Sequence, residues 1–259
     1  MNRNLLRVFT GAALTVAAFW AVSASAQMAE VKEKPPIYAY VSNWAIPRAQ
    51  WGEMEKANAA DQKILEKAFS AGTIIGYGDD TTLVHEVDGS THDNWWASYS
   101  IAGLLSTLEQ FYTNGSATSP VLASATKHWD DIFVSRYYNW HPGSYKGVYT
   151  RGMVYKLKAD APNDAVEMLS KNLFVPMFEK LLADGAIHEY DIDTQSIHTA
   201  SPDMFFIFFV AANGDGLDKA NAAIRETLKA NPTYGPAFGS MVDYDAHRDF
   251  LARTNAIYK

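Results

Sequence analysis

One stretch of the chain occurs twice, and this internal repeat constrains the fold more than any other feature. Residues 66–85, EKAFSAGTIIGYGDDTTLVH, match residues 179–198, EKLLADGAIHEYDIDTQSIH, without a gap and 113 positions apart. The identical pairs are Glu66/Glu179, Lys67/Lys180, Gly72/Gly185, Ile74/Ile187, Tyr77/Tyr190, Asp80/Asp193, Thr81/Thr194 and His85/His198. A repeat of this kind predicts a chain built from two copies of one structural unit.

Three shorter blocks repeat in the same order at slightly different distances. They are residues 93–96 with 203–206, Pro120 and Ser124 with Pro236 and Ser240, and residues 133–136 with 250–253. Chance can produce one match of this quality, but chance does not keep later matches in order. We therefore interpret the pattern as the duplication of a gene segment.

Residues 1–26 have the layout of a secretory signal peptide. A short basic start with Arg3 and Arg7 precedes an apolar run, and Ala24-Ser25-Ala26 forms a small-residue cleavage site. The run falls short of the roughly 20 residues that span a bilayer. We expect cleavage after Ala26, a periplasmic or secreted bacterial protein, and no membrane span after cleavage.

The composition of the mature chain excludes several classes of function. Removal of the two arginines leaves 20 basic residues against 29 acidic ones, so nucleic acid is not an expected partner. The chain has no cysteine, which excludes disulfides, thiolate catalysis and thiolate metal sites. Hydrophobic residues make up 48% of the chain, enough for a well-packed core.

Each copy predicts the order strand, helix, strand, strand, helix. In the first copy the predicted strands are 37–41, 73–87 and 94–101, with helices at 47–72 and 104–112; in the second the strands are 148–157, 186–192 and 204–210, with helices at 163–184 and 217–230. After a tether at 27–36, we place the first repeat at 37–146 and the second at 147–259. A mostly helical arm is expected to end each repeat, over 121–140 in the first.

The predicted strand 204–210, MFFIFFV, is apolar on both faces. Such a strand must be covered twice, by helices on one side and by another sheet on the other. Each buried phenylalanine would stabilise the fold by roughly 2–3 kcal/mol. We therefore predict an α+β fold in which two ferredoxin-like βαββα repeats pack sheet to sheet as a single-chain α/β barrel.

This arrangement resembles the dimeric α/β-barrel superfamily of ferredoxin-like folds in a duplicated form, over residues 37–230. The resemblance implies a cleft between each sheet and its helices. Relatives use this cleft for cofactor-free oxidation of aromatic compounds, for isomerisation, or for haem. The peroxidase branch carries a Gly-x-x-Asp-Gly signature, and here Ala212 precedes Asp215-Gly216 where the first glycine is required. The resemblance does not fix a function.

His85 and His198 are candidate catalytic residues, because they occupy equivalent places just after a predicted strand. An imidazole can act as a base near neutral pH or as a ligand of metal or haem. Tyr77 and Tyr190 would line the cleft beside them. The alternative is that both histidines are hydrogen-bonded to loop backbone and have no chemical role.

Candidate ligand-binding residues are the matched arginines Arg136 and Arg253 and the aromatic residues Trp95, Trp96 and Tyr99. An arginine can hold a carboxylate of a ligand, and aromatic rings suit a flat apolar molecule. The arginines can equally form ion pairs with neighbouring acids, and the aromatic residues can serve as core.

No metal site is predicted, and the sequence assigns no cofactor. His85-Glu86, His92-Asp93 and His128-Trp129-Asp130-Asp131 place imidazole and carboxylate groups close together. None of them has an established ligand spacing such as H-E-x-x-H. We expect His92 in a solvated loop and His128 on a helix surface.

The sequence favours an exported protein that binds a small apolar or aromatic molecule in a cleft of the barrel. One alternative is an enzyme, either a cofactor-independent monooxygenase or a haem or metal protein that uses His85 or His198. Another is a structural or interaction protein of the cell envelope, in which the aromatic arm 121–145 contacts a partner or a second copy. A homo-oligomer is compatible with each interpretation.

Overall fold

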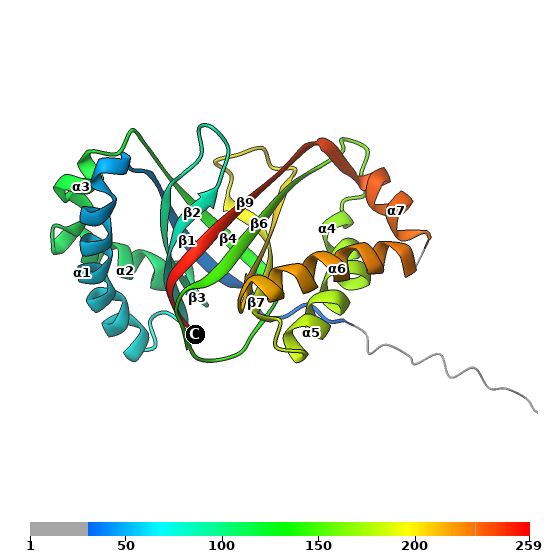
Figure 1. Ribbon diagram of the computed structural model, residues 1–259, viewed down its shortest axis with the longest axis horizontal. Coiled ribbons are helices and arrows are strands. Elements are labelled where there is room, and N and C mark those ends of the chain that lie inside the picture. The colour runs from blue at the N-terminus through cyan, green and yellow to red at the C-terminus, as the bar shows by residue number, and fades with distance from the viewer. Residues whose placement is uncertain (1–30, 231) are drawn as a thin grey trace, which may run out of the picture. The chain divides into compact units, whose positions relative to one another are not determined.

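The computed structural model describes residues 31–230 and 232–259, so the predicted signal peptide lies outside the described residues. Eight antiparallel strands form a closed barrel (Figure 1). The strands are β1 (Ile37–Ala45), β2 (Gly76–Val84), β3 (His92–Ser98), β4 (Lys127–Trp140), β6 (Val148–Leu157), β7 (Ile187–Ile197), β8 (Met204–Ala211) and β9 (Val242–Tyr258). Their order is β2-β3-β1-β4-β7-β8-β6-β9, and pairing of β9 with β2 closes the ring. The short strand β5 (Ser144–Tyr145) adds to β9.

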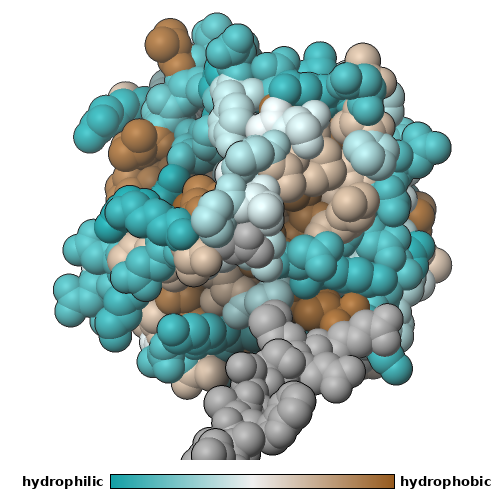
Figure 2. Space-filling model, turned by 90° about the vertical axis from the view of Figure 1, so that its right-hand side faces the viewer, coloured by the Kyte–Doolittle hydropathy of each residue, from teal (hydrophilic) through white to brown (hydrophobic). Residues whose placement is uncertain are grey.

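The helices flank the barrel on two sides (Figure 1). On the side of the first half lie α1 (Trp51–Ser70), α2 (Ile101–Thr113) and α3 (Pro120–Ala123), with short 3-10 turns at Arg48–Gln50 and Ser116–Thr118. On the side of the second half lie α4 (Ala165–Leu169), α5 (Val175–Ala183), α6 (Gly214–Ala230) and α7 (Tyr234–Met241). The outer face of this second group is mostly hydrophilic (Figure 2), because the apolar stripes of its helices face the barrel.

The two halves share one connectivity. Each runs strand, helix, strand, strand, helix, strand, and within each half the strands lie in the order second, third, first, fourth. The fourth strand of each half, β4 or β9, pairs with the second strand of the other half, β7 or β2. The α+β class and the closed barrel agree with the prediction, and the barrel walls are continuous rather than two separate stacked sheets.

The helical arms of the prediction are wrong. Helix α3 takes up only Pro120–Ala123 of the first arm, and the rest is the long strand β4. Trp129, Asp131 and Phe133 point into the barrel at every second position, which is the period of a strand. The prediction of a helix over these aromatic residues is therefore wrong. The C-terminal arm is likewise mostly strand, β9.

The strand register identifies which residues of the two halves correspond. Asp80 pairs with Asp93 between β2 and β3, and Asp193 pairs with Phe206 between β7 and β8. Because Asp80 and Asp193 correspond in the 113-position match, Asp93 corresponds to Phe206. The predicted match of residues 93–96 with 203–206 is therefore out of register by three residues.

The last predicted match, 133–136 with 250–253, is also out of register. Ser135 lies opposite Asp193, and Thr254 lies opposite Asp80, so Ser135 corresponds to Thr254. This places Arg136 and Arg253 two positions apart in the shared connectivity. Only the match of 66–85 with 179–198 is reproduced by the strand pairing.

Strand β8 is covered on both faces, as the sequence predicted. Phe205, Ile207 and Phe209 are fully buried in the core formed with the helices of the second half. Phe206 and Phe208 face the barrel interior, where both rings contact Phe133. The sheet surface that covers the interior side belongs to the other half of the chain.

The ends of α1 and α5 are built alike. Each is followed by a glycine with a left-handed backbone, Gly72 with φ +71° and Gly185 with φ +67°. The amide of Gly72 donates to the Phe69 carbonyl, and that of Gly185 donates to the Leu182 carbonyl. This is the expected glycine cap of a helix C-terminus, and it confirms the predicted end at Gly72.

Pro176 interrupts the predicted helix 163–184. A π-helical turn over Ser170–Phe174 separates α4 from α5 immediately before the proline. Proline has no amide hydrogen to donate to the preceding turn, so the helix widens there. Within residues 31–230 and 232–259, no helix is long and apolar enough to cross a membrane.

Candidate binding cavity

A cavity of about 410 Å³ lies inside the barrel. Its walls are the inward-facing residues, which alternate along every strand with residues that face the helices. The aromatic residues of the lining are Trp95, Trp129, Phe133, Phe206, Phe208, Phe209 and Phe250. The carboxyl groups of the interior are Asp80, Asp93, Asp131, Glu189, Asp191 and Asp193, and Glu86, Asp88 and Asp249 also belong to the lining. An apolar wall and a strongly acidic wall therefore share one enclosed space.

Asp80 and Asp93 form a buried carboxyl pair. They are directly opposite on β2 and β3, and only 2% and 8% of their surfaces are exposed. Asp80 Oδ1 accepts a hydrogen bond of 2.5 Å from the Thr254 hydroxyl. Burial, together with the charge of Asp79, raises the pKa of Asp80 to about 6, against the opposing hydrogen bonds of Thr254 and Asp93. Burial and the charge of Asp80 raise the pKa of Asp93 as well, so the pair holds a proton more readily than isolated aspartates.

Asp191 and Asp193 form a second pair, two residues apart on the same face of β7. Burial is the main cause that raises the pKa of Asp193, to about 7. The pKa of Asp191 is also raised, first by burial and then by the charges of Asp193 and Glu189. Asp193 lies opposite Ser135 of β4.

The two pairs face each other across the barrel. Asp80 is on β2 and Asp193 is on β7, and three strands separate β2 from β7 in either direction around the ring. Two groups that can exchange a proton near neutral pH therefore line opposite walls of one cavity. Such an arrangement can bind cationic or hydroxyl groups and can supply a general acid or base.

Lys259 is the cationic side chain of the interior. Its Nζ lies 2.6 Å from Glu189 Oε1, and the Lys259 and Glu189 side chains are 3% and 7% exposed. The same ammonium lies 4.9 Å from the ring centroids of Trp95 and Trp140. A carboxylate and two indole rings thus hold one positive charge at the cavity wall.

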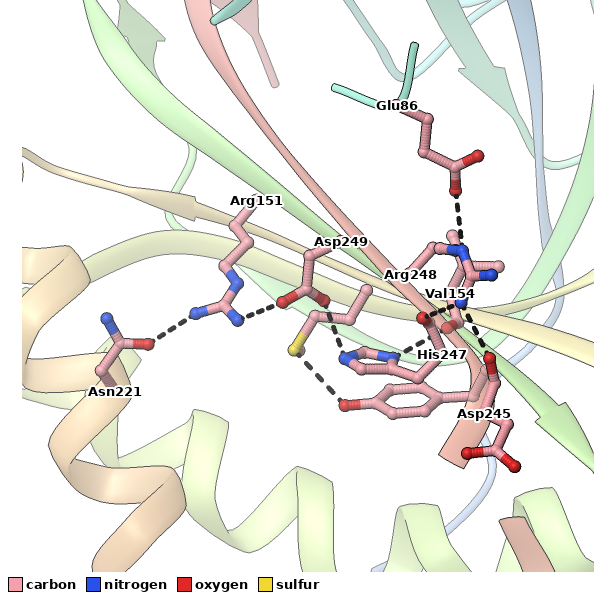
Figure 3. Close-up of polar contacts among 10 residues, drawn as sticks. Glu86, Arg151, Val154, Asn221, Asp245, His247, Arg248 and Asp249 are labelled. Atoms are coloured by element: carbon pink, nitrogen blue, oxygen red, sulfur yellow. Dashed lines mark hydrogen bonds and ion pairs between the residues drawn. The ribbon is translucent and has the colours of Figure 1, made fainter. Parts of the chain in front are cut away.

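Arg248 and Glu86 lie at the mouth, with 3.4 Å between Arg248 Nε and Glu86 Oε1 (Figure 3). About half of each of these side chains is exposed. In the same view a separate chain of contacts runs from Arg151 through Asp249 to His247. Because the guanidinium groups of Arg151 and Arg248 both have acidic partners, they leave the acidic interior largely unneutralised.

The predicted catalytic residues do not meet at one site. His85 follows the end of β2 and lines the mouth, where its Nδ1 is 2.5 Å from the Glu86 carbonyl oxygen. His198 lies just after β7 and is exposed. Tyr77 and Tyr190 are 2% and 1% exposed and face the helices rather than the cavity. The Tyr190 hydroxyl donates to Glu179 Oε1 at 2.6 Å.

The predicted ligand-binding residues divide among different environments. Trp95 lines the cavity, whereas Trp96 faces the helices and stacks on Tyr40 at 4.5 Å between ring centroids. Tyr99 is 58% exposed. Arg136 Nε lies 3.0 Å from Glu33 Oε1 at the surface, and Arg253 is also exposed. Trp95 is therefore the predicted residue with a direct place in the cavity.

His92 and His128 lie in environments that differ from those predicted from the sequence. His92 is in β3 and is 1% exposed, packed edge-on against Trp51 at 5.1 Å. Burial lowers the pKa of His92 to about 4. His128 is on strand β4, stacked on Trp44 at 3.6 Å. The predicted solvated loop and helix surface are wrong, because both residues belong to strands that the helices of the first half cover.

The two carboxyl pairs are candidate site residues that the sequence does not predict. Asp80 and Asp193 are among the identical pairs of the repeat, yet nothing local shows that they face an enclosed space. The available signal was Asp191-Ile192-Asp193, in which acids occupy alternate positions at the end of the predicted strand 186–192 and just beyond it. Asp93 carries no such signal, because its partner Asp80 lies on another strand.

A smaller pocket of about 210 Å³ lies between the sheet and the helices of the first half. This is the position of the cleft that the family resemblance implied. Its polar lining includes Asp61, His128 and Asp130, and the Ser42 hydroxyl donates to Asp130 Oδ1 at 2.8 Å. In the second half, the rings of Tyr155, Phe174, Phe205 and Phe238 pack together in the corresponding layer.

The lining of the larger cavity does not fit a haem. Haem carries anionic propionates, which the carboxyl groups of this interior would repel, and its iron takes an axial ligand such as histidine. Among the described residues that line the cavity, His85 is the only histidine, and it lies at the exposed mouth. Across the part of the chain that the structure describes, no group of three or more His, Asp or Glu residues is placed to hold a metal ion.

Comparison with solved structures shows the fold. A candidate monooxygenase from Lactobacillus acidophilus has a TM-score of 0.59 and 11% identity, with 87% of this chain and 97% of that chain covered. A candidate monooxygenase from Fusobacterium nucleatum has a TM-score of 0.59 and 9% identity, with 87% and 95% covered. The chain has the dimeric α/β-barrel fold.

An anthrone oxidase-like protein is similar too, with a TM-score of 0.51 and 10% identity over 87% of this chain and 93% of that chain. No family model matches the sequence, and no curated protein matches it. At such low identity the likeness concerns the fold, and the function has to be argued from the cavity.

Proposed function

We propose that the protein binds a small molecule with an aromatic or apolar body inside the barrel. The observation that carries this proposal is the cavity of about 410 Å³ with seven aromatic residues in its lining. Ligand pockets typically measure about 300–1,000 Å³ and combine an apolar wall with a few polar groups. Phe133, Phe206 and Phe208 already contact one another and form a continuous wall of rings.

We also propose that the protein is exported and that its halves are copies of one ferredoxin-like unit. Support for export is the layout of residues 1–26, and a mature protein that begins at Gln27 on N-terminal sequencing would test it. Support for duplication is the shared connectivity and the register-matched pairs of residues 66–85 and 179–198.

If the ligand binds in this cavity, a larger side chain in the lining should weaken its binding. Val41→Trp adds an indole to the lining on β1 and is expected to weaken the binding of the neutral probe 2-phenylethanol at least about tenfold, or about 1.4 kcal/mol. Ligand-observed NMR titration measures this. Leu105→Trp, at a 45% exposed position of α2, is the matched control and should bind as the parent protein does.

Two results of that titration contradict the proposed site. One is the absence of saturable binding by the parent protein. The other is equal binding by the Val41→Trp variant, which would place the probe outside the barrel. Circular dichroism of both tryptophan variants shows whether the added ring has disturbed the fold.

A cofactor-independent oxygenase is the second candidate, supported by the carboxyl pairs beside an aromatic wall and by the fold shared with candidate monooxygenases. One carboxylate would remove a proton from an activated C–H group, and the resulting carbanion would reduce O2. For an anthrone, this gives the anthraquinone and water. Oxygen consumption with anthrone by metal-free protein tests it, and Asp193→Asn should abolish any activity that uses this base.

The cell-envelope interaction protein loses its main support. The arm 121–145 was expected to present aromatic residues to a partner. Instead, Trp129 and Phe133 face the interior and Tyr137 is 7% exposed. Trp129 and Phe133 therefore line the cavity, and Tyr137 packs in the core beneath the helices of the second half.

A further inference from the structure

The cavity lining has an excess of negative groups over positive ones. Six carboxyl groups line the interior together with Lys259, and the guanidinium of Arg248 at the mouth already has Glu86 as a partner. Even if each aspartate pair keeps one proton, the carboxylates outnumber the cation that Lys259 supplies. Charges in such an enclosed space are screened by solvent much less than charges at the surface.

Several buried oxygen atoms of the lining have no hydrogen-bond donor among the described residues. Glu189 Oε2 and Thr82 Oγ1 are two of them, on side chains that are 5% and 4% exposed as whole residues. Asp191 Oδ1 is a third. Buried polar atoms are normally satisfied, and a carboxylate without a donor is costly. The acidic wall therefore has fewer hydrogen-bond donors than acceptors.

Lys259 shows how this wall holds an ammonium group. Its Nζ uses one oxygen of Glu189 and two indole faces, and leaves the second oxygen of Glu189 free. Asp191 lies on the same strand, β7, two residues from Glu189, and opposite Phe208 of β8. A second ammonium can thus meet a carboxylate and an aromatic ring on adjacent strands.

We propose that the ligand of this cavity is an organic cation, a primary or secondary amine on an aromatic or apolar body. The ammonium would lie beside the carboxyl groups of Glu189 and Asp191, and the body would lie against Trp95, Phe208 and Phe133. This inference rests on the proposed function and narrows the class of ligand. An anionic molecule of the same shape would be repelled by the acidic wall, and an uncharged one would leave its negative charge uncompensated.

Binding of such a cation should release a proton. The groups around Asp191 are Asp193 and Glu189 on its own strand, Lys259, and its register partners Tyr138 on β4 and Phe208 on β8. The ammonium competes with the proton that the pair of aspartates holds because of its burial. We therefore expect the binding enthalpy to change with the ionisation enthalpy of the buffer near neutral pH.

Three probes of one shape test the charge preference. Calorimetric titration of the intact chain with 2-phenylethylammonium, 2-phenylethanol and phenylacetate is expected to give affinities in that order, with the cation at least about tenfold tighter than the alcohol. Asp191→Asn keeps the shape of the side chain and should reduce this preference about tenfold or more, with little change for the alcohol. Asp218→Asn, on the exposed face of α6, is the matched control.

The outcomes separate this inference from the proposed function. If the alcohol binds in a way that Val41→Trp blocks, but the cation binds no more tightly, the cavity is a site for aromatic molecules and the cation inference is wrong. If the cation binds more tightly and Asp191→Asn leaves the preference intact, a group other than Asp191 recognises the ammonium, and the inference is also wrong. If none of the probes binds, both proposals are contradicted.

Discussion

Replacement of Phe205 by alanine is expected to lower the free energy of unfolding by about 3–5 kcal/mol, the usual cost of removing a buried phenylalanine. The Phe205 side chain is fully buried between β8 and the helices of the second half. Its ring lies 5.1 Å from that of Tyr155 and 6.5 Å from that of Phe174. The neighbouring rings are held by strands and helices, so they cannot collapse into the space left behind. Urea-induced unfolding followed by circular dichroism measures the change.

Phe206, the next residue of β8, is the matched control. Its ring faces the cavity, is only half-buried, and lies 4.8 Å from that of Phe133. Phe206→Ala therefore enlarges an existing space and is expected to cost roughly 1–2 kcal/mol. Equal losses for the two variants would contradict the assignment of one face to the core and the other to the cavity.

Replacement of Asp193 by asparagine is expected to stabilise the protein at alkaline pH and to have little effect near pH 4. The folded state raises the pKa of Asp193 to about 7, chiefly by burial, against about 3.9 in an unfolded chain. Between these values the folded protein holds a proton that the unfolded chain releases. Stability contributed by Asp193 is therefore lost as the pH rises from about 4 to 7.

Asparagine resembles the protonated aspartate and does not titrate. At about pH 8 the Asp193→Asn variant should exceed the parent protein in unfolding free energy by on the order of 2–4 kcal/mol, since one pKa unit corresponds to about 1.4 kcal/mol. The charged groups near Asp193 are Asp191, Glu189 and Lys259. The range allows for the response of Asp191, which shares the proton.

The contribution of Asp193 is obtained from the difference in unfolding free energy between the variant and the parent protein. The lowered pKa of His92, about 4, contributes stability that is lost as the pH falls below about 6.5, which opposes the effect of Asp193 in the same window. Thermal unfolding of both proteins across this range, with Asp218→Asn as a surface control, gives the difference. A difference that does not change with pH would show that Asp193 titrates normally.

The sequence predicted those helices and strands whose residue pattern depends on near neighbours in the chain. The stretch 204–210 is apolar on both faces, and β8 packs against the helical core on one face and lines the cavity with the other. The helix that ends at Gly72 and the two strands after it follow from capping and turn residues. Pro176 lies just after the π-helical turn in which the hydrogen bonding of the helix changes. These features depend on neighbours within a few residues, so they can be read directly from the chain.

The long last strand of each half could not be recognised in this way. Residues 127–140 carry closely spaced aromatic and polar side chains that fit either a helix or a strand. One edge of this segment pairs with β1 of the same half, and the other pairs with β7, whose residues lie about 50–65 positions further along the chain. A segment of this kind becomes a strand because an edge of the other half is available to it, and that edge exists only in the folded protein.

The sequence alone determined the α+β class and the order strand, helix, strand, strand, helix in each half, because helix caps, turns and side-chain periods act over short distances. The tertiary structure alone decided the closure of the barrel, the register, and the meeting of Asp80 with Asp93 and of Asp191 with Lys259 in one enclosed space. Pairing between distant strands sets that register, and a shift by one residue turns every side chain to the opposite face. A carboxyl group acquires its raised pKa, and the cavity its acidic wall, only after those strands have paired.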